Sequence, residues 1–238
     1  MITPIPETKI KTEITVLDLL LKGGIETDVI TTIYGPSGTG KSNICILTAA
    51  NFAKNGKKVI YIDTEGGFSV ERFKQVTQND ITSLDNILIL QPLTFEEQRD
   101  VFSKLNNLVT DEISLIVVDT ISMLYRLEMG RSEDIYSINR ELGRQLSNLT
   151  EITRRRKIPI IITNQVYANF EEKNKVNMVG GDIMKYGSKC LIELQKTNEG
   201  QRSANLRKHR SIIEGEKIDF KIENTDMTNL IINSENNE

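Results

Sequence analysis

A glycine-rich segment near residue 40 has the residue types and the spacing that bind phosphate groups. It matches the pattern G-x-x-x-x-G-K-[ST] over eight residues, namely Gly35, Pro36, Ser37, Gly38, Thr39, Gly40, Lys41 and Ser42. Glycines allow the backbone to turn successive N–H groups inward, toward an anion. We expect Lys41 to neutralise the β- and γ-phosphates of a nucleotide and the Ser42 hydroxyl to be a ligand of Mg²⁺. The alternative is a glycine-rich turn with a chance Lys-Ser, which the predicted strand before it and helix after it disfavour.

Two carboxylates and one amide follow predicted strands and supply further groups that phosphoryl transfer needs. Asp119 ends the apolar run Leu115–Asp119, which is typical of a Walker B strand, and we expect it to hold Mg²⁺. Glu65 lies at the edge where open α/β sheets bind ligands, so it is a candidate base for activating water. Gln165 is a candidate sensor of the γ-phosphate. The alternatives are an Asp that caps a turn, a solvated loop Glu, and a glutamine without a role at the site.

The elements that must position these groups alternate along the chain. Short β-branched runs predict strands at 30–35, 58–64, 86–90, 114–120 and 158–163. Their nearly continuous hydrophobicity indicates burial on both faces, as in a parallel sheet. Apolar residues at helical spacing predict helices at 42–55, 69–78, 94–109 and 135–156. Right-handed βαβ crossovers then give an α/β fold, with a mainly parallel central sheet flanked by helices.

After residue 163 the alternation of apolar strands with helices becomes weaker. The polar stretch 167–182 predicts a long, mobile loop, and strands at 190–197, 204–211 and 217–223 predict a C-terminal β meander that closes the sheet. The last six residues predict a disordered end. We therefore expect one domain, with an N-terminal leader at 1–16, a core at 17–223 and a partly disordered acidic tail at 224–238.

Composition excludes several classes of protein. Apolar residues make up 38% of the 238 residues, which excludes a collagen-like or globally disordered chain. The net charge of −3 provides no overall steering toward nucleic acid or membranes, so any anion site must be local. No run of about 20 apolar residues and no secretory signal is present, so we expect no membrane association. Cys45 and Cys190 are expected to be free thiols in a reducing cytoplasm.

Taken together, the motifs resemble the RecA/RadA recombinase family over nearly the whole chain, and most strongly its short archaeal paralogues. The similarity runs through six segments, Leu17–Ser42, Tyr61–Phe73, Leu115–Ser122, Ile162–Val166, Gly180–Lys196 and Arg207–Ile222. The order of the I-D-T-E-G and T-N-Q motifs around the two Walker motifs is far more specific than the phosphate loop alone. The resemblance implies a RecA-like P-loop NTPase core that uses ATP and Mg²⁺ in recombination and DNA repair.

The resemblance also implies residue roles and partners. It implies catalytic roles for Glu65, Lys41 and Gln165, adenine packing for Arg72, and two DNA-facing loops at 126–134 and 167–182. Arg202–Arg210 contains four basic residues and no acid, but equally fits solvated strand charges. Expected DNA contacts are Arg131, Lys185, Tyr186, Lys189, Arg202, Arg207, Lys208 and Arg210. Expected partners are single-stranded or junction DNA, a RadA-type recombinase and a Holliday-junction resolvase.

Departures from the family pattern predict weak hydrolysis rather than strand exchange. Only about fifteen residues precede the core, the Phe-x-x-Ala filament peptide has no counterpart, and the D-A-P element that caps ATP is replaced by residues 210–216. We expect a monomer or a small homo-oligomer. Two alternatives remain: a mediator that binds ATP without hydrolysing it, and a KaiC-like signalling ATPase that does not bind DNA.

Overall fold

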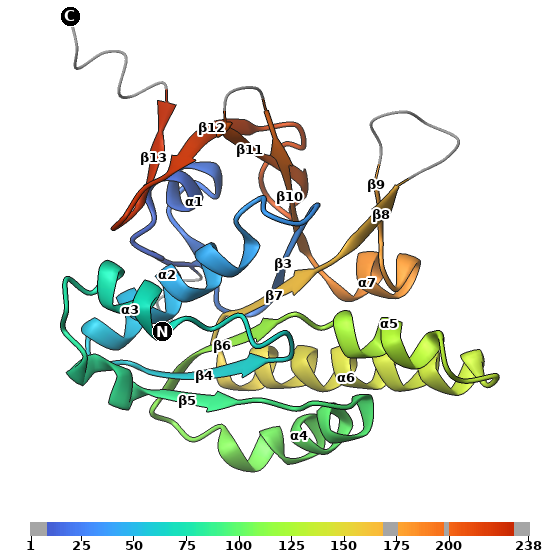
Figure 1. Cartoon of the computed structure of the whole chain (residues 1–238). Coiled ribbons are helices and arrows are strands. Elements are labelled where there is room, and N and C mark those ends of the chain that lie inside the picture. Colours follow the sequence, from blue (N-terminus) through green and yellow to red (C-terminus); the bar gives the residue numbers. More distant parts are fainter. Residues whose placement is uncertain (1–8, 169–175, 198–199, 231–238) are drawn as a thin grey trace, which may run out of the picture.

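The structure is a computed structural model and describes residues 9–168, 176–197 and 200–230. The parallel strands of the main sheet are β3 (Ile30–Tyr34), β4 (Lys58–Asp63), β5 (Ile87–Leu90), β6 (Ile113–Asp119), β7 (Ile160–Asn164) and β10 (Cys190–Lys196). Three antiparallel strands extend it, β11 (Arg202–Lys208), β12 (Lys217–Ile222) and β13 (Met227–Asn229). The order in this nine-stranded sheet is β13-β12-β11-β10-β3-β7-β6-β4-β5 (Figure 1).

Helices cover both faces of the sheet. One face packs against α1 (Thr15–Leu20), α2 (Lys41–Lys54) and α3 (Val70–Val76). The other packs against α4 (Phe95–Leu108), α5 (Met123–Met129), α6 (Ile135–Arg156) and α7 (Gly181–Gly187) (Figure 1). In β4, Val59 and Tyr61 enter the first apolar core, whereas Ile60 and Ile62 enter the second. Because successive strand residues face opposite sides, a sheet with two covered faces needs an unbroken apolar run.

The expected fold class is therefore confirmed, as an α/β sheet that is mainly parallel and ends in an antiparallel meander. Helix α6 has the expected bounds, and the strands that carry the motifs begin and end within two residues of the expected positions. Cys45 and Cys190 are buried free thiols, as expected. Among the described residues, no helix is long and apolar enough to cross a membrane.

The prediction of one long loop at 167–182 is wrong for the residues that the structure describes there. Strand β8 (Val166–Ala168) pairs antiparallel with β9 (Val176–Met178), and α7 already begins at Gly181. Residues 169–175 lie outside the described part of the chain. Strands of three residues lack the length over which an apolar alternation can be recognised, which is why the sequence pattern missed them.

The ends of the chain also hold structure that the pattern missed. Strand β1 (Lys9–Ile10) pairs with β2 (Ile25–Glu26), and Ile14 is fully buried, so the described part of the expected leader packs on the core. In the expected tail, β13 pairs with β12. The last eight residues lie outside the described part of the chain. The domain boundaries themselves stay predictions.

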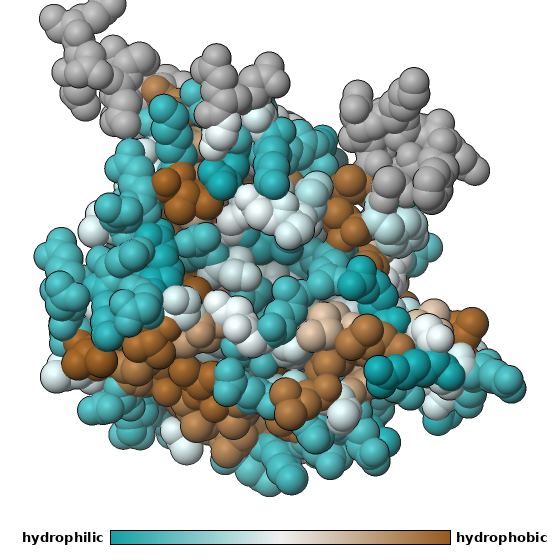
Figure 2. All heavy atoms as spheres, viewed as in Figure 1, coloured by the Kyte–Doolittle hydropathy of each residue, from teal (hydrophilic) through white to brown (hydrophobic). Residues whose placement is uncertain are grey.

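Strand β5 forms an open edge of the sheet. The 3-10 helix η1 (Thr82–Asn86) precedes it, and large apolar side chains are exposed at Ile81, Leu88 and Leu93. Figure 2 shows apolar side chains gathered over this lower part of the molecule. No described strand covers this edge.

Candidate functional site

A cavity of about 340 Å³ lies at the carboxyl ends of the central parallel strands. It is lined by Gly35, Ser37, Gly38, Gly40, Lys41, Ser42, Asn43, Glu65, Asp119, Arg126, Gln165 and Val166. Strands β3, β4, β6 and β7 each end at this edge, and the segments that follow them carry the lining residues. The structure thus brings the phosphate loop, both predicted carboxylates and Gln165 to one place, as parallel strands do.

The glycine-rich segment forms the turn between β3 and α2. Gly40 caps α2 with a φ of 106°, a left-handed conformation that residues with a Cβ rarely adopt. A Cβ on Gly35 would overlap the carbonyl group of Leu194 in β10. The loop therefore lies tightly against β10 and leads into the N-terminus of α2, the end of a helix that favours anions.

Lys41 is half-buried and holds the loop in place. Its Nζ donates to the carbonyl oxygens of Gly35 at 2.8 Å and Pro36 at 3.0 Å. Burial lowers the pKa of Lys41, and the nearby carboxylates of Glu65 and Asp119 oppose this shift. A phosphate group would add negative charge beside this ammonium and stabilise its charged form.

Asp119 is buried and oriented through both of its oxygens. Its Oδ1 accepts from Thr163 Oγ1 at 2.6 Å, and its Oδ2 accepts from the Tyr61 hydroxyl at 3.0 Å. Burial raises the pKa of Tyr61 well above its usual value, and the charge of Asp119 adds to this shift. Tyr61 therefore stays protonated and remains a donor to the carboxylate.

The residues present fit the Mg²⁺ ion that the motifs imply. Ser42 Oγ and Asp119 Oδ2 lie 3.8 and 3.9 Å from the point that a Cβ on Gly67 would occupy, so they flank one gap that glycine leaves open. Mg²⁺ is commonly held by one or two protein oxygens together with phosphate oxygens and waters. A hydroxyl and a carboxylate oxygen beside the same gap meet that requirement.

Glu65 and Gln165 contact each other directly. Gln165 Nε2 donates to Glu65 Oε1 at 2.5 Å, and the Gln165 backbone N–H donates to Ser122 Oγ at 3.0 Å. Asp63 shapes the loop that carries Glu65, because its carboxylate accepts from the N–H groups of Gly67 at 3.0 Å and Phe68 at 3.1 Å. The loops that follow β4 and β7 are therefore joined at the cavity.

Sequence reasoning missed four residues that shape or line the cavity, namely Tyr61, Asp63, Arg126 and Thr163. Tyr61 lies four positions before Glu65, and Thr163 lies two positions before Gln165. Because side chains an even number of positions apart in a strand leave the same face, this spacing could have identified both residues. Arg126 lines the cavity from α5, a short helix for which the sequence shows no clear periodicity.

Arg72 lies at one end of α3 and is absent from the lining of the cavity. Its guanidinium donates to the carbonyl oxygens of Asn224 at 2.7 Å and Glu223 at 2.8 Å, and to Asn43 Oδ1 at 2.8 Å. In this structure Arg72 therefore attaches α3 to the turn between β12 and β13. Adenine packing by Arg72 stays a prediction.

Four of the eight expected DNA contacts lie together, around α7 and the start of β10. Lys208 Nζ donates to the carbonyl oxygens of Lys185 at 2.7 Å and Ser188 at 2.8 Å. Burial lowers the pKa of Lys208, and the charge of Lys189 lowers it further. Tyr186 is 77% exposed on the same helix as Lys185. We call Lys185, Tyr186, Lys189 and Lys208 the α7 patch.

The other four expected DNA contacts are elsewhere. Arg207 pairs with Glu193 at 2.6 Å, and Arg210 pairs with Asp28 at 2.6 Å and Glu26 at 2.8 Å. Arg202 lies against the phosphate loop, with its Nε 3.4 Å from the Gly38 carbonyl oxygen. The charges of the Arg202–Arg210 run therefore do not form one surface.

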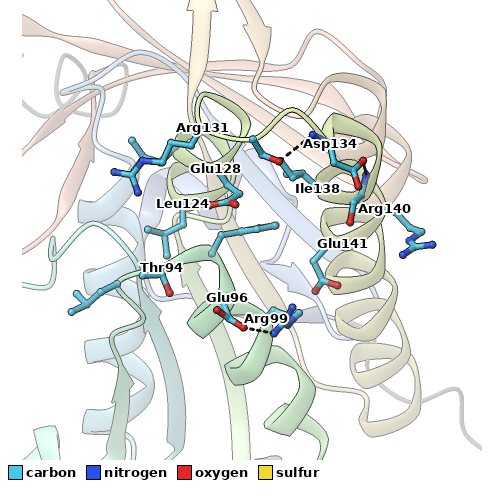
Figure 3. A pocket seen from close by; sticks show the side chains of 15 residues that line it. Thr94, Glu96, Arg99, Leu124, Glu128, Arg131, Asp134, Ile138, Arg140 and Glu141 are labelled. Atoms are coloured by element: carbon cyan, nitrogen blue, oxygen red, sulfur yellow. Dashed lines mark hydrogen bonds and ion pairs between the residues drawn. The ribbon is translucent and has the colours of Figure 1, made fainter.

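Arg131 lines a different and larger hollow, of about 610 Å³ (Figure 3). This hollow lies between α4, α5 and α6, and its rim carries both acids and bases, including the Glu96–Arg99 pair at 2.9 Å. It contains none of the predicted phosphate-binding residues. The smaller cavity, which does contain them, is therefore the candidate site.

Comparison with known proteins assigns the chain to a family. The sequence profile named Rad51 matches residues 7–230 of the chain. The chain belongs to the Rad51 family. The "DNA repair and recombination protein RadB" of Methanobrevibacter smithii is 41% identical over 213 residues, which cover 87% of this chain and 90% of that protein. The protein of the same name from Methanococcus maripaludis strain C7 is 45% identical over 208 residues, covering 87% and 94%.

A solved structure agrees with the family assignment. The crystal structure of the RadB recombinase has a TM-score of 0.77 to this one at 36% sequence identity, and the match covers 91% of this chain and 97% of that chain. The resemblance inferred from the motifs and the RecA-like fold are thus confirmed, and the chain is a recombinase paralogue. Recombinases of this family are in general ATPases that bind ATP with Mg²⁺ and act with DNA.

Proposed function

We propose that this Rad51-family protein binds ATP, hydrolyses it weakly, binds DNA, and assists homologous recombination and DNA repair. One observation carries the proposal: Lys41, Ser42, Glu65, Asp119 and Gln165 line a single cavity at the carboxyl edge of the sheet. These are the group types that position phosphates, hold Mg²⁺ and activate water in P-loop NTPases. The printed name of the RadB relatives, DNA repair and recombination protein, supports the cellular role.

In the proposed reaction, the amides of the phosphate loop and Lys41 bind the phosphate chain. Lys41 exchanges its present acceptors, the Gly35 and Pro36 carbonyl oxygens, for phosphate oxygens. Ser42 and Asp119 would hold Mg²⁺, which when bound neutralises charge on the phosphates. Glu65 would accept a proton from the water that attacks the γ-phosphorus, while the bond from this phosphorus to the bridging oxygen breaks and ADP leaves.

Two features support slow turnover and its coupling to DNA. Glu65 already accepts a hydrogen bond from Gln165, so it must exchange that partner before it can take a proton from water. Gln165 directly precedes β8, whose pairing with β9 begins at Val166. A move of Gln165 toward a γ-phosphate would therefore pull on the segment that the family resemblance directs toward DNA.

The proposed partners are single-stranded or junction DNA, a RadA-type recombinase and a Holliday-junction resolvase, with the protein acting as a monomer or a small homo-oligomer. The α7 patch supports DNA contact, because three cations and one exposed tyrosine suit phosphates and an unstacked base. The paired Arg207 and Arg210 give weaker support.

The hydrogen bond between Gln165 and Glu65 also favours a second candidate, a mediator that binds ATP without hydrolysing it. Steady-state ATP turnover at low salt, with and without single-stranded DNA, separates the two, with Lys41→Ala as the blank. We expect slow turnover that DNA stimulates and that Glu65→Ala abolishes. Turnover equal to the blank in a protein that still binds ATP would identify the mediator. Turnover that ignores DNA would instead favour a signalling ATPase.

A further inference from the structure

Two cations from β10 and β11 lie over the tip of the phosphate loop. Lys196 and Arg202 are directly paired across the two antiparallel strands, so their side chains leave the same face of the sheet. A Cβ on Gly38 would lie 2.9 Å from Lys196 Nζ, and Arg202 Nε lies 3.4 Å from the Gly38 carbonyl oxygen. Both charged groups therefore converge on one glycine of the loop.

This arrangement is unfavourable without an anion. Like charges directly opposite each other on paired strands repel. Lys41 adds a third positive charge nearby, and its pKa, lowered mainly by burial, is lowered further by Lys196. Within the described residues, neither Lys196 nor Arg202 forms an ion pair, and the side chain of Arg202 donates hydrogen bonds only to the carbonyl oxygens of Gly38 and Gly200. Glu199, the acid of this hairpin, lies outside the described part of the chain.

We propose that Lys196 and Arg202 form a cationic clamp that binds phosphate oxygens of the nucleotide at the outer side of the phosphate loop. The inference rests on the ATP site proposed above and adds two ligands to it. Gly38 itself lines the cavity, whereas Lys196 and Arg202 approach the same glycine from outside that lining. A phosphate chain cradled by the loop would therefore bring its oxygens close to both side chains. Two converging charge-assisted contacts would offset the repulsion that the free protein carries.

A nucleotide phosphate suits the clamp better than a nucleic-acid phosphate. Arg202 begins β11 and Lys208 ends it, which separates the clamp from the α7 patch by roughly 20 Å along the strand. Arg202 of the clamp contacts the phosphate loop at Gly38, whereas Lys208 of the α7 patch contacts the Lys185 carbonyl oxygen on α7. We therefore assign the clamp to ATP and leave the α7 patch to DNA.

The test compares ATP binding by the wild type and by Lys196→Gln/Arg202→Gln, measured by calorimetry with Mg²⁺. We expect the double variant to bind ATP roughly five- to twentyfold more weakly, as two partly exposed charge contacts would. Lys104→Gln/Arg154→Gln removes the same charge from exposed positions on α4 and α6, across the sheet from α2, and should leave the affinity unchanged. Equal affinity of the wild type and the clamp variant would overturn the proposal.

Thermal unfolding without nucleotide distinguishes ligand binding from a structural role. Because the variant loses like-charge repulsion, its midpoint should equal or exceed that of the wild type, while stabilisation by ATP shrinks. A lower midpoint with an unchanged stabilisation by ATP would mean that the two residues serve folding. The exchanged variant Lys196→Arg/Arg202→Lys keeps both charges and should bind ATP within about twofold of the wild type. A loss as large as in the neutral variant would contradict a charge-based clamp.

Two further measurements are needed. One distinguishes ATP from DNA as the source of the bound phosphate, and the other distinguishes failure of the clamp from failure of the proposed ATP site. With ATP saturating, the clamp variant should bind a labelled single-stranded oligonucleotide as the wild type does. Weaker oligonucleotide binding with unchanged ATP binding would assign the clamp to DNA and overturn the inference. Lys41→Ala tests the ATP site itself. If Lys41→Ala loses ATP affinity and the clamp variant does not, only the clamp is refuted; if neither loses affinity, the proposed ATP site fails as well.

Discussion

At the scale of single residues, the carboxylate of Asp119 has fixed neighbours before any ligand arrives. Tyr61 and Thr163 each donate a hydroxyl hydrogen bond to it, from the strands on either side of β6. A buried carboxylate without such partners would carry a large desolvation penalty. The same two contacts that stabilise the charge also fix the orientation of the Asp119 carboxylate.

Replacing Tyr61 with Phe should therefore affect both stability and Mg²⁺ binding. We expect the free energy of unfolding to fall by about 1 kcal/mol, since one hydrogen bond to a buried carboxylate is lost. The Mg²⁺ concentration needed for half-maximal ATP binding should rise, because Asp119 can rotate. Urea unfolding and a Mg²⁺ titration measure the two effects. Tyr34→Phe is the control, since the Tyr34 hydroxyl forms no hydrogen bond within the described residues.

His209, the one histidine of the chain, should make stability depend on pH. Its Nδ1 accepts from the N–H groups of Ser211 at 3.1 Å and Ile212 at 3.2 Å, and its Nε2 lies 3.7 Å from Glu26 Oε2. Burial lowers the pKa of His209 below 6.5, and Lys9 and Arg210 lower it further, while Glu26 opposes them.

The unfolded chain then takes up the proton more readily than the folded one. The contribution of His209 is fully present above about pH 6.5 and is lost as the pH falls toward the lower folded pKa. We expect His209→Gln to flatten the fall in unfolding free energy between about pH 7.5 and pH 5, measured by urea unfolding. The same slope in wild type and variant would show that other groups cause it.

At the scale of elements, Arg72 joins parts that are distant in sequence. Its guanidinium lies on α3, and its carbonyl partners lie in the turn before β13, 151 and 152 residues later in the chain. Among the strands of the described residues, β13 pairs only with β12, and it stands at the end of the sheet. Its attachment therefore depends on contacts such as this one.

Arg72→Ala should loosen β13 without unfolding the core. We expect the amides of Met227–Asn229 to exchange with solvent about tenfold faster, because charge-assisted hydrogen bonds to two carbonyl oxygens are lost. Hydrogen-exchange mass spectrometry measures this. Arg99→Ala removes an arginine that pairs within α4 and should leave β13 unchanged. If exchange in β13 is unaffected by Arg72→Ala, the turn is held by other contacts.

At the scale of the whole molecule, the net charge of −3 leaves DNA affinity to local surfaces. The α7 patch contains three lysines. By contrast, Arg207 forms an ion pair with Glu193, and Arg210 forms ion pairs with Glu26 and Asp28. Binding that depends on a few phosphate contacts falls steeply with salt. The protein should therefore bind single strands only at low ionic strength.

Substituting Gln for Lys185, Lys189 and Lys208 together should weaken that dependence. For three lost phosphate contacts, the slope of log K against log salt concentration should become shallower by about 2 for single-stranded DNA. Fluorescence anisotropy of a labelled oligonucleotide at several salt concentrations measures the slope. Lys104→Gln/Arg154→Gln should leave it unchanged. An unaltered slope in the lysine variant would move the DNA surface away from α7.

The sequence by itself indicated the phosphate loop, the order of strands and helices, and two carboxylates at the ligand-binding edge of the sheet, Glu65 just after β4 and Asp119 at the end of β6. These features depend on neighbouring residues: a contiguous motif, a period of two or of 3.6, and the rule that parallel strands end at one edge. Helix α6 was predicted to its last residue for the same reason, since 22 residues repeat one apolar face. Short elements such as β8, β9 and α7 contain too few residues to show a period.

Only the tertiary structure decided which charges face each other. In sequence, Arg202, Arg207 and Arg210 form one basic run. In the fold, Arg202 reaches the phosphate loop, Arg207 meets Glu193, and Arg210 meets Asp28, which lies 182 residues earlier. Such pairs depend on the order and register of strands in the sheet, which the local pattern of the sequence does not specify. The division of these bases between the phosphate loop and structural ion pairs therefore follows from folding, because long-range packing brings each one to its partner.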